Sequence, residues 1–137
     1  MKTKFAALAA AVAFSSGLPA LAHHSFAAEY DSDKKITITG KVVSVELVNP
    51  HSWLHVEATG PDGAVKDWAC EFGPPNGLYR NGWTKKSVNK GDMVTINGSL
   101  AKNGSATINA SQITTSDGKR LFAGSSQGAA EGTAPKQ

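Results

Sequence analysis

The four histidines of the chain occur in two places, and histidine is the most common transition-metal ligand in proteins. His23 and His24 are adjacent near the N-terminus, and His51 and His55 are four residues apart further along. If the chain is cleaved after Ala22, His23 offers both an α-amine and a ring nitrogen, which can close a six-membered chelate on one metal ion. A third nitrogen from His24, His51 or His55 would complete a nitrogen-rich site of the kind that Cu(II) prefers. The sequence therefore suggests that His23, His24 and His51 bind a divalent metal such as Cu(II).

Strand geometry limits this metal site. On a regular strand, residues four apart are separated by about 13 Å, so His51 and His55 cannot both bind one ion. Zinc would also accept imidazoles but prefers four tetrahedral ligands. The copper motif that requires histidine as the third mature residue is absent, because Ser25 occupies that position. The alternative interpretation is a solvated N-terminus at His23 and His24, with ordinary strand residues at His51 and His55.

A second candidate site is a ligand surface that includes Trp53, His55 and Trp83. Tryptophan rings stack on sugar rings or on bases, and the strand that carries Trp53 also carries His55. Such a surface would bind an envelope glycan, a peptide, a protein or another small ligand. For Trp83, which follows Gly82, the alternative is that its ring closes one end of a barrel beneath a short helix.

The sequence predicts a non-enzymatic protein, because its candidate catalytic residues form no recognisable catalytic arrangement. No G-x-S-x-G nucleophile elbow occurs in the sequence. Asp67 and Glu71 share the predicted outer face of one strand, where carboxylates are nearly always solvated. Cys70 alternates with Trp68 and Phe72, which predicts a buried structural thiol. No histidine follows Cys70, and this excludes a blue-copper centre.

The residues that would position these side chains form short strands separated by turn signals. Proline and glycine clusters, such as Gly60-Pro61-Asp62-Gly63 and Asn103-Gly104, mark the turns. In the first strand the apolar alternation slips between Val42 and Val43 beside Gly40, which predicts a bulge in a bent strand. The expected elements are strands over Ile36–Leu47, Ser52–Thr59, Val65–Phe72, Met93–Ala101, Ala106–Thr115 and Leu121–Phe122, with a helix over Gly77–Asn81.

Three strands, a short helix and two further strands is the element order of an OB-type barrel. The fold class predicted is therefore all-β with one short helix, a small OB-like barrel of five to six strands. An open barrel of another topology is the main alternative. The barrel domain is expected over residues 36–123, after an N-terminal segment over 23–35 without clear periodicity. Residues 124–137 are small and polar, and are predicted to be a disordered tail.

The first 22 residues have the features of an export signal. Lys2 and Lys4 give a positive start, Phe5–Phe14 is an apolar run, and Ala20-Leu21-Ala22 is an A-x-A cleavage site. The run is too short to span a bilayer, so no membrane span is expected. Cleavage would leave 115 of the 137 residues, beginning at His23.

Charge argues against a nucleic-acid partner. The chain has 14 Lys and Arg against 11 Asp and Glu, which gives a formal charge of +3. Loss of Lys2 and Lys4 with the signal lowers this charge to +1, which is too small for a nucleic-acid footprint.

Four short motifs resemble a family of small exported bacterial proteins that carries a domain-of-unknown-function label. They are His23-His24-Ser25-Phe26, Asn49-Pro50-His51, Gly82-Trp83-Thr84 and Gly91-Asp92. The resemblance extends from His23 to about Gly124 and implies a periplasmic location in a Gram-negative bacterium. It implies no activity, so no catalytic residue and no cofactor is carried over from it.

Overall fold

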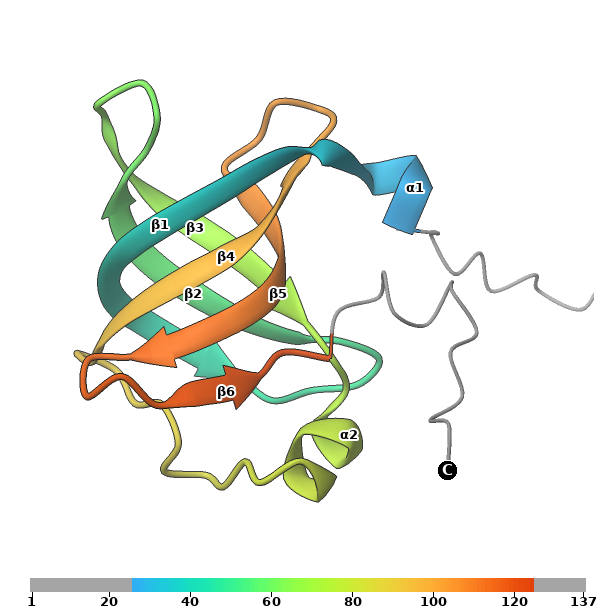
Figure 1. The fold of residues 1–137 in the computed structure, drawn as a ribbon, viewed down its shortest axis with the longest axis vertical. Coiled ribbons are helices and arrows are strands. Elements are labelled where there is room, and N and C mark those ends of the chain that lie inside the picture. The colour runs from blue at the N-terminus through green and yellow to red at the C-terminus, as the bar shows by residue number, and fades with distance from the viewer. Residues whose placement is uncertain (1–25, 125–137) are drawn as a thin grey trace, which may run out of the picture.

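The computed structural model describes residues 26–124, which form a strongly curved sheet with two very short helices (Figure 1). No helix in this part of the chain is long and apolar enough to cross a membrane. The elements are α1 (Phe26–Glu29), β1 (Tyr30–Glu46), β2 (Ser52–Thr59), β3 (Val65–Phe72), α2 (Pro75–Arg80), β4 (Met93–Ala101), β5 (Thr107–Thr115) and β6 (Arg120–Phe122).

The hydrogen bonds of the sheet close into a ring. β1 pairs with both β2 and β4, β2 pairs with β3, and β4 pairs with β5, all antiparallel. A short parallel pairing of β3 with β5 completes the ring, and β6 adds to β5. With α2 between β3 and β4, this is the OB-like arrangement expected from the sequence. The structure also contains α1, a short helix before β1 that was not expected from the sequence.

The first strand is longer than its sequence pattern indicates. β1 begins at Tyr30 instead of Ile36, because Tyr30 and Lys35 also pair with β4. Their pairing is irregular, with a register shift between Tyr30 and Lys35, so no period-2 alternation marks this part of the strand. The predicted bulge is confirmed as a register shift between Val42 and Ser44 in the pairing with β2.

The bounds of β2, β3 and β4 are as predicted, and α2 begins earlier than expected. It covers Pro75–Arg80 rather than Gly77–Asn81, because Pro75 takes the first helical position, where a missing N–H costs nothing. Asn81 ends the helix, and Gly82 follows in the left-handed region with φ of 89°. The chain therefore reverses, and the backbone N–H of Trp83 donates to the carbonyl of Leu78 in α2 at 3.0 Å.

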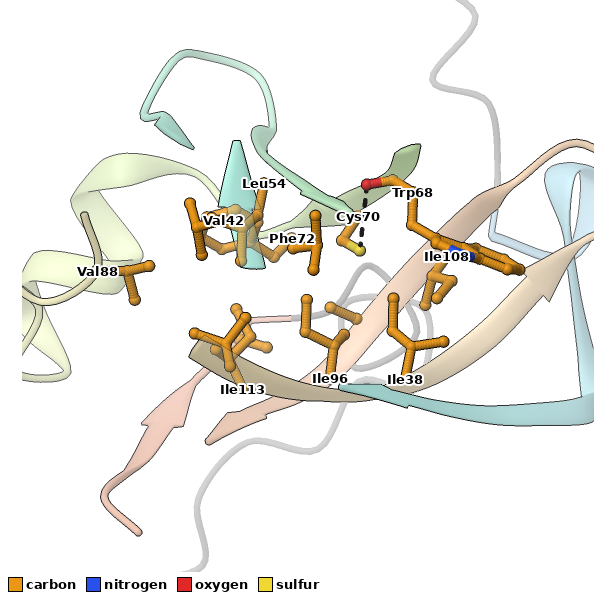
Figure 2. Packing of buried hydrophobic residues seen from close by; sticks show 14 of the residues in the cluster. Ile38, Val42, Leu54, Trp68, Cys70, Phe72, Val88, Ile96, Ile108 and Ile113 are labelled. Atoms are coloured by element: carbon orange, nitrogen blue, oxygen red, sulfur yellow. Dashed lines mark hydrogen bonds between the residues drawn. The ribbon is translucent and has the colours of Figure 1, made fainter. Parts of the chain in front are cut away.

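The core fills the interior of the closed sheet. Alternate residues of each strand point inward, and Figure 2 shows Ile38, Ile96 and Ile113 facing Val42, Leu54 and Phe72. Leu78 of α2 is fully buried and belongs to the same cluster. Cys70 lies within the core at 0% exposure, so the prediction of a buried thiol is confirmed.

Gly98 lies where β4 and β5 approach each other closely. A Cβ atom at this position would lie 2.3 Å from the Asn109 carbonyl oxygen and 2.4 Å from Cγ2 of Ile108. We expect Gly98→Ala to lower the free energy of unfolding by about 1–3 kcal/mol, since backbone must move to admit the methyl group. Gly77→Ala is the control, because its nearest neighbour would be 3.9 Å away. Equal urea midpoints for Gly98→Ala and the wild type would contradict the close approach.

Candidate functional site

His51 lies immediately before β2 and is held by a carboxylate. It follows the cis peptide bond between Asn49 and Pro50, and its side chain is 35% exposed. Its Nδ1 contacts Oε1 of Glu71 on β3. A carboxylate oxygen accepts hydrogen bonds, so this contact places a proton on Nδ1 and leaves the Nε2 lone pair of the neutral ring available.

Glu71 is buried, contrary to the sequence interpretation. Asp67 and Glu71 were expected to share a solvated face, and Asp67 does have a side chain that is 59% exposed. The side chain of Glu71 is only 6% exposed. The parallel pairing of Glu71 with Asn109 on β5 and the approach of Tyr30 from β1 cover this end of the outer face. A buried carboxylate is stable only when donors satisfy it, and two donors reach Glu71.

The second donor to Glu71 is the Tyr30 hydroxyl, which contacts Oε2. Tyr30 is 3% exposed, and its ring stacks on that of Phe26 with centroids 5.7 Å apart. The backbone N–H of Lys102 donates to the Glu29 carbonyl at 2.8 Å, which ties α1 to the turn between β4 and β5. The start of the described chain is thereby fixed beside Glu71.

Sequence reasoning missed Tyr30 and Glu71 as site residues. One signal was available, since Phe26 and Tyr30 are four residues apart, the spacing at which side chains on one helical turn meet. No local pattern links Tyr30 to Glu71, because 41 residues separate them.

His55 makes a weaker version of the same contact. Its Nδ1 lies 3.4 Å from Oδ1 of Asp67. His55 pairs with Ala69, and its partner Asp67 lies two residues before Ala69 on β3. In the same register, Glu71 lies two residues before the position opposite His51. The pairing of β2 with β3 shows no register shift, which supports the expectation that one ion cannot reach both histidines. The exposed pair of His55 and Asp67 is therefore a natural control for His51 and Glu71.

The two candidate tryptophans have different environments. Trp53 is half-buried on β2 and lines a cavity of about 500 Å³ together with Tyr30, Thr107 and the turn between β4 and β5. Trp83 is 4% exposed, stacks on Phe72 with centroids 5.3 Å apart, and donates its indole N–H to the Phe122 carbonyl at 2.6 Å. The packing uses the ring of Trp83, so this residue does not belong to an exposed ligand surface with Trp53 and His55.

Comparison with known proteins gives one match. The model of a family of unknown function, DUF6152, matches residues 11–110. The chain belongs to this family. No curated protein and no solved structure matches it. The DUF6152 match includes His51, Glu71 and Tyr30, but the family has no assigned activity from which a role for them could be taken.

The DUF6152 match also includes His23 and His24, which lie outside the described residues. The expected export signal over residues 1–22 lies outside them too, and so does the expected tail except for Gly124. Within residues 26–124, no group of three or more His, Cys, Asp or Glu side chains is placed to hold a metal ion. His51 and Glu71 alone make a two-residue arrangement that needs further ligands to become a metal site.

The thiol of Cys70 and the phenol of Tyr30 are buried acidic groups, and they predict that the protein loses stability at alkaline pH. Burial raises the pKa of the Cys70 thiol to about 12, and burial together with Glu71 raises the pKa of the Tyr30 phenol well above its usual value. The unfolded chain releases the thiol proton at about pH 9 and the phenol proton at about pH 10, while the native chain keeps both. The native state then binds more protons, so the free energy of unfolding falls as pH rises.

Urea unfolding of the wild type and of Cys70→Ala between pH 8 and pH 11 checks this prediction. The wild type should lose stability as pH rises above about 9. Cys70→Ala should show a smaller loss that begins nearer pH 10, where free tyrosine ionises. A wild-type stability that stays constant to pH 11 would contradict the burial of both acids.

Proposed function

We propose that this chain is a non-enzymatic periplasmic protein that binds one divalent metal ion, most favourably Cu(II), through His51 and the mature N-terminal residues His23 and His24. The observation that carries the proposal is the contact of His51 Nδ1 with the buried carboxylate of Glu71. The other elements are the export signal and the chelating chemistry of an N-terminal histidine, both inferred from the sequence.

The contact between His51 and Glu71 is the arrangement that tunes metal-binding histidines. A histidine ligand commonly donates its second ring nitrogen to a carboxylate, which fixes the tautomer and the ring orientation and increases ligand basicity. Here Tyr30 holds the other oxygen of Glu71, so the carboxylate itself is positioned. The side chain of His51 remains about one-third exposed, which supports its use as a ligand through Nε2.

A short length of chain connects the proposed ligands His23 and His24 to the structure beside His51 and Glu71. Phe26 is buried against Tyr30, whose hydroxyl donates to Glu71. His24 precedes Phe26 by two residues and His23 by three. Two or three residues of chain span at most about 7 to 10 Å. This supports a site in which the N-terminus and His51 share one ion.

Cu(II) fits this donor set better than the hard cations do. An α-amine and imidazoles are nitrogen ligands of the type that Cu(II) binds in tetragonal sites, whereas Mg²⁺ and Ca²⁺ prefer oxygen ligands. The amine has a pKa of about 8 when free, so a bound metal displaces its proton readily. Only cleavage after Ala22 frees this amine at His23.

Calorimetric titration of Cu(II) into protein exported by a bacterial host tests the proposal. His51→Ala should weaken the binding of one equivalent by at least about tenfold, because one of few ligands is lost. His55→Ala is the matched control on the same strand and should leave affinity unchanged. A variant with one extra residue ahead of His23 should also bind weakly, since the chelate is broken. Unchanged affinity in His51→Ala, or equal losses in His51→Ala and His55→Ala, would overturn the proposal.

The cavity beside Trp53 supports a second candidate function, a binding module for an envelope glycan. Besides Trp53 and Tyr30, its lining includes Asn103, Ser105 and Thr107. An aromatic face with amide and hydroxyl groups around it suits a sugar ring. Glu29 and Lys102 also line the cavity, and charged side chains can hydrogen-bond to sugar hydroxyls. Titration with an oligosaccharide of N-acetylglucosamine, followed by NMR, should shift these residues in the wild type and not in Trp53→Ala. Absence of shifts in the wild type would exclude this ligand class.

A further inference from the structure

Positive charge is concentrated in one segment of the chain. Residues 73–91 contain Arg80, Lys85, Lys86 and Lys90 and no acidic residue. The remaining residues of the range 26–124 contain seven basic and ten acidic residues, so they carry a net negative charge. Figure 1 shows this segment, with α2 and the loop leading to β4, at the lower end of the sheet. The protein therefore presents a basic end on an otherwise acidic body.

The basic end also contains a groove with an apolar lining. The groove has a volume of about 450 Å³ and lies between the end of β1, α2 and the loop before β4. Its apolar residues include Val88, which is 4% exposed and part of the core, and Tyr79, which is 41% exposed. The full lining consists of Val45, Leu47, Tyr79, Lys85, Val88, Asn89 and Lys90.

The two lysines that line the groove are not neutralised by neighbouring carboxylates. Within residues 26–124 the lysine ion pairs are Lys34 with Asp31 and Lys66 with Asp62, both far from this segment in sequence. No ion pair in that range involves Lys85 or Lys90, so both ammonium groups are free to meet an anion. Ammonium groups beside an apolar lining suit a ligand that has one apolar part and one anionic part.

We propose that this groove binds an anionic amphiphile, a single acyl chain that carries a phosphate or carboxylate head group. Val45, Leu47, Tyr79 and Val88 contact the acyl chain, and burial of that chain supplies most of the free energy of binding. Lys85 and Lys90 pair with the head group. The volume is that of a small-molecule site. An acidic peptide fits less well, because its backbone N–H groups need acceptors and the side chains of the lining offer only the Asn89 amide and the Tyr79 hydroxyl.

NMR titration with dodecyl phosphate below its micelle concentration tests this proposal on the full mature chain. Residues of the groove should shift, whereas inorganic phosphate should bind at least about tenfold more weakly, because it lacks the apolar part. Dodecyl maltoside, with the same chain and no charge, should also bind at least about tenfold more weakly, because it cannot pair with the lysines. Equal binding of dodecyl maltoside would overturn the role of the lysines, and equal binding of inorganic phosphate would reduce the site to an anion patch.

A charge-matched pair of variants locates the site. Lys85→Glu with Lys90→Glu should lower the affinity for dodecyl phosphate by at least about tenfold. Lys34→Glu with Lys66→Glu makes the same change in net charge at residues that line a different pocket and not the groove, and should leave the affinity within about twofold. Equal losses in the two double variants would overturn the proposal in favour of general charge attraction. Tighter binding of a Glu-rich peptide than of dodecyl phosphate, or binding only to anionic vesicles, would also overturn it.

Discussion

Replacement of Glu71 by glutamine is expected to weaken Cu(II) binding by about 10- to 100-fold, the usual cost of removing a partner that orients a metal ligand. The variant Glu71→Gln keeps the shape of the side chain, and its amide oxygen can still accept the Tyr30 hydroxyl. It removes the negative charge that holds the proton on His51 Nδ1 and orients the ring. Calorimetric titration of Cu(II) at pH 7 measures the effect.

The matched control for this experiment is Asp67→Asn. Asp67 contacts His55 as Glu71 contacts His51, but at 3.4 Å and with a side chain that is 59% exposed. We expect Asp67→Asn to leave Cu(II) affinity within about twofold, because contacts between exposed charges contribute little. A similar loss in both variants would mean that net charge alone governs metal affinity. No loss in Glu71→Gln would remove Glu71 from the site.

Replacement of Trp83 by alanine is expected to lower the free energy of unfolding by about 3–5 kcal/mol, the typical cost of removing a buried aromatic ring. The ring of Trp83 stacks on Phe72 within the core, and its indole N–H is the donor to the Phe122 carbonyl. Trp53→Ala is the control and should cost less, because Trp53 is only half-buried on the outer face. Urea unfolding followed by far-ultraviolet circular dichroism measures both variants.

A loss of this size is a large fraction of the stability of a small domain, so Trp83→Ala could fail to fold. Trp83→Phe keeps an aromatic ring against Phe72 and removes only the N–H donor to Phe122. We expect it to fold and to lose about 1–2 kcal/mol, because the carbonyl then lacks its partner. A Trp83→Phe or Trp83→Ala variant as stable as the wild type would contradict the structural role of Trp83.

The strands could be predicted because their signals are local. Alternation of apolar residues and the turn residues between the strands gave β2, β3 and β4 with their observed bounds. The order of three strands, helix and two strands gave the closed arrangement. The slip of the apolar alternation after Gly40 predicted the bulge of β1, which is the register shift between Val42 and Ser44. Gly40 itself lies close to β2, since a Cβ atom there would lie 2.2 Å from the Glu57 carbonyl oxygen.

The candidate site could be predicted only in part, because its contacts join distant segments. His51 was singled out from its residue type, but alternation along β3 placed Glu71 with the exposed Asp67. Alternation tells which side of the sheet a residue faces, and it cannot tell whether another segment covers that side. Tyr30, 41 residues away, provides the cover. Trp83 is a similar case, because Gly82 in the left-handed region turns it into the core.

Native mass spectrometry of protein exported by a bacterial host, recorded with and without one equivalent of Cu(II), is the most direct test of the proposed metal site. We predict a mass that corresponds to a chain beginning at His23, with one copper ion retained at low protein concentration. The same mass without retained copper would contradict the metal site. A chain that begins at any other residue would contradict the chelating His23 amine.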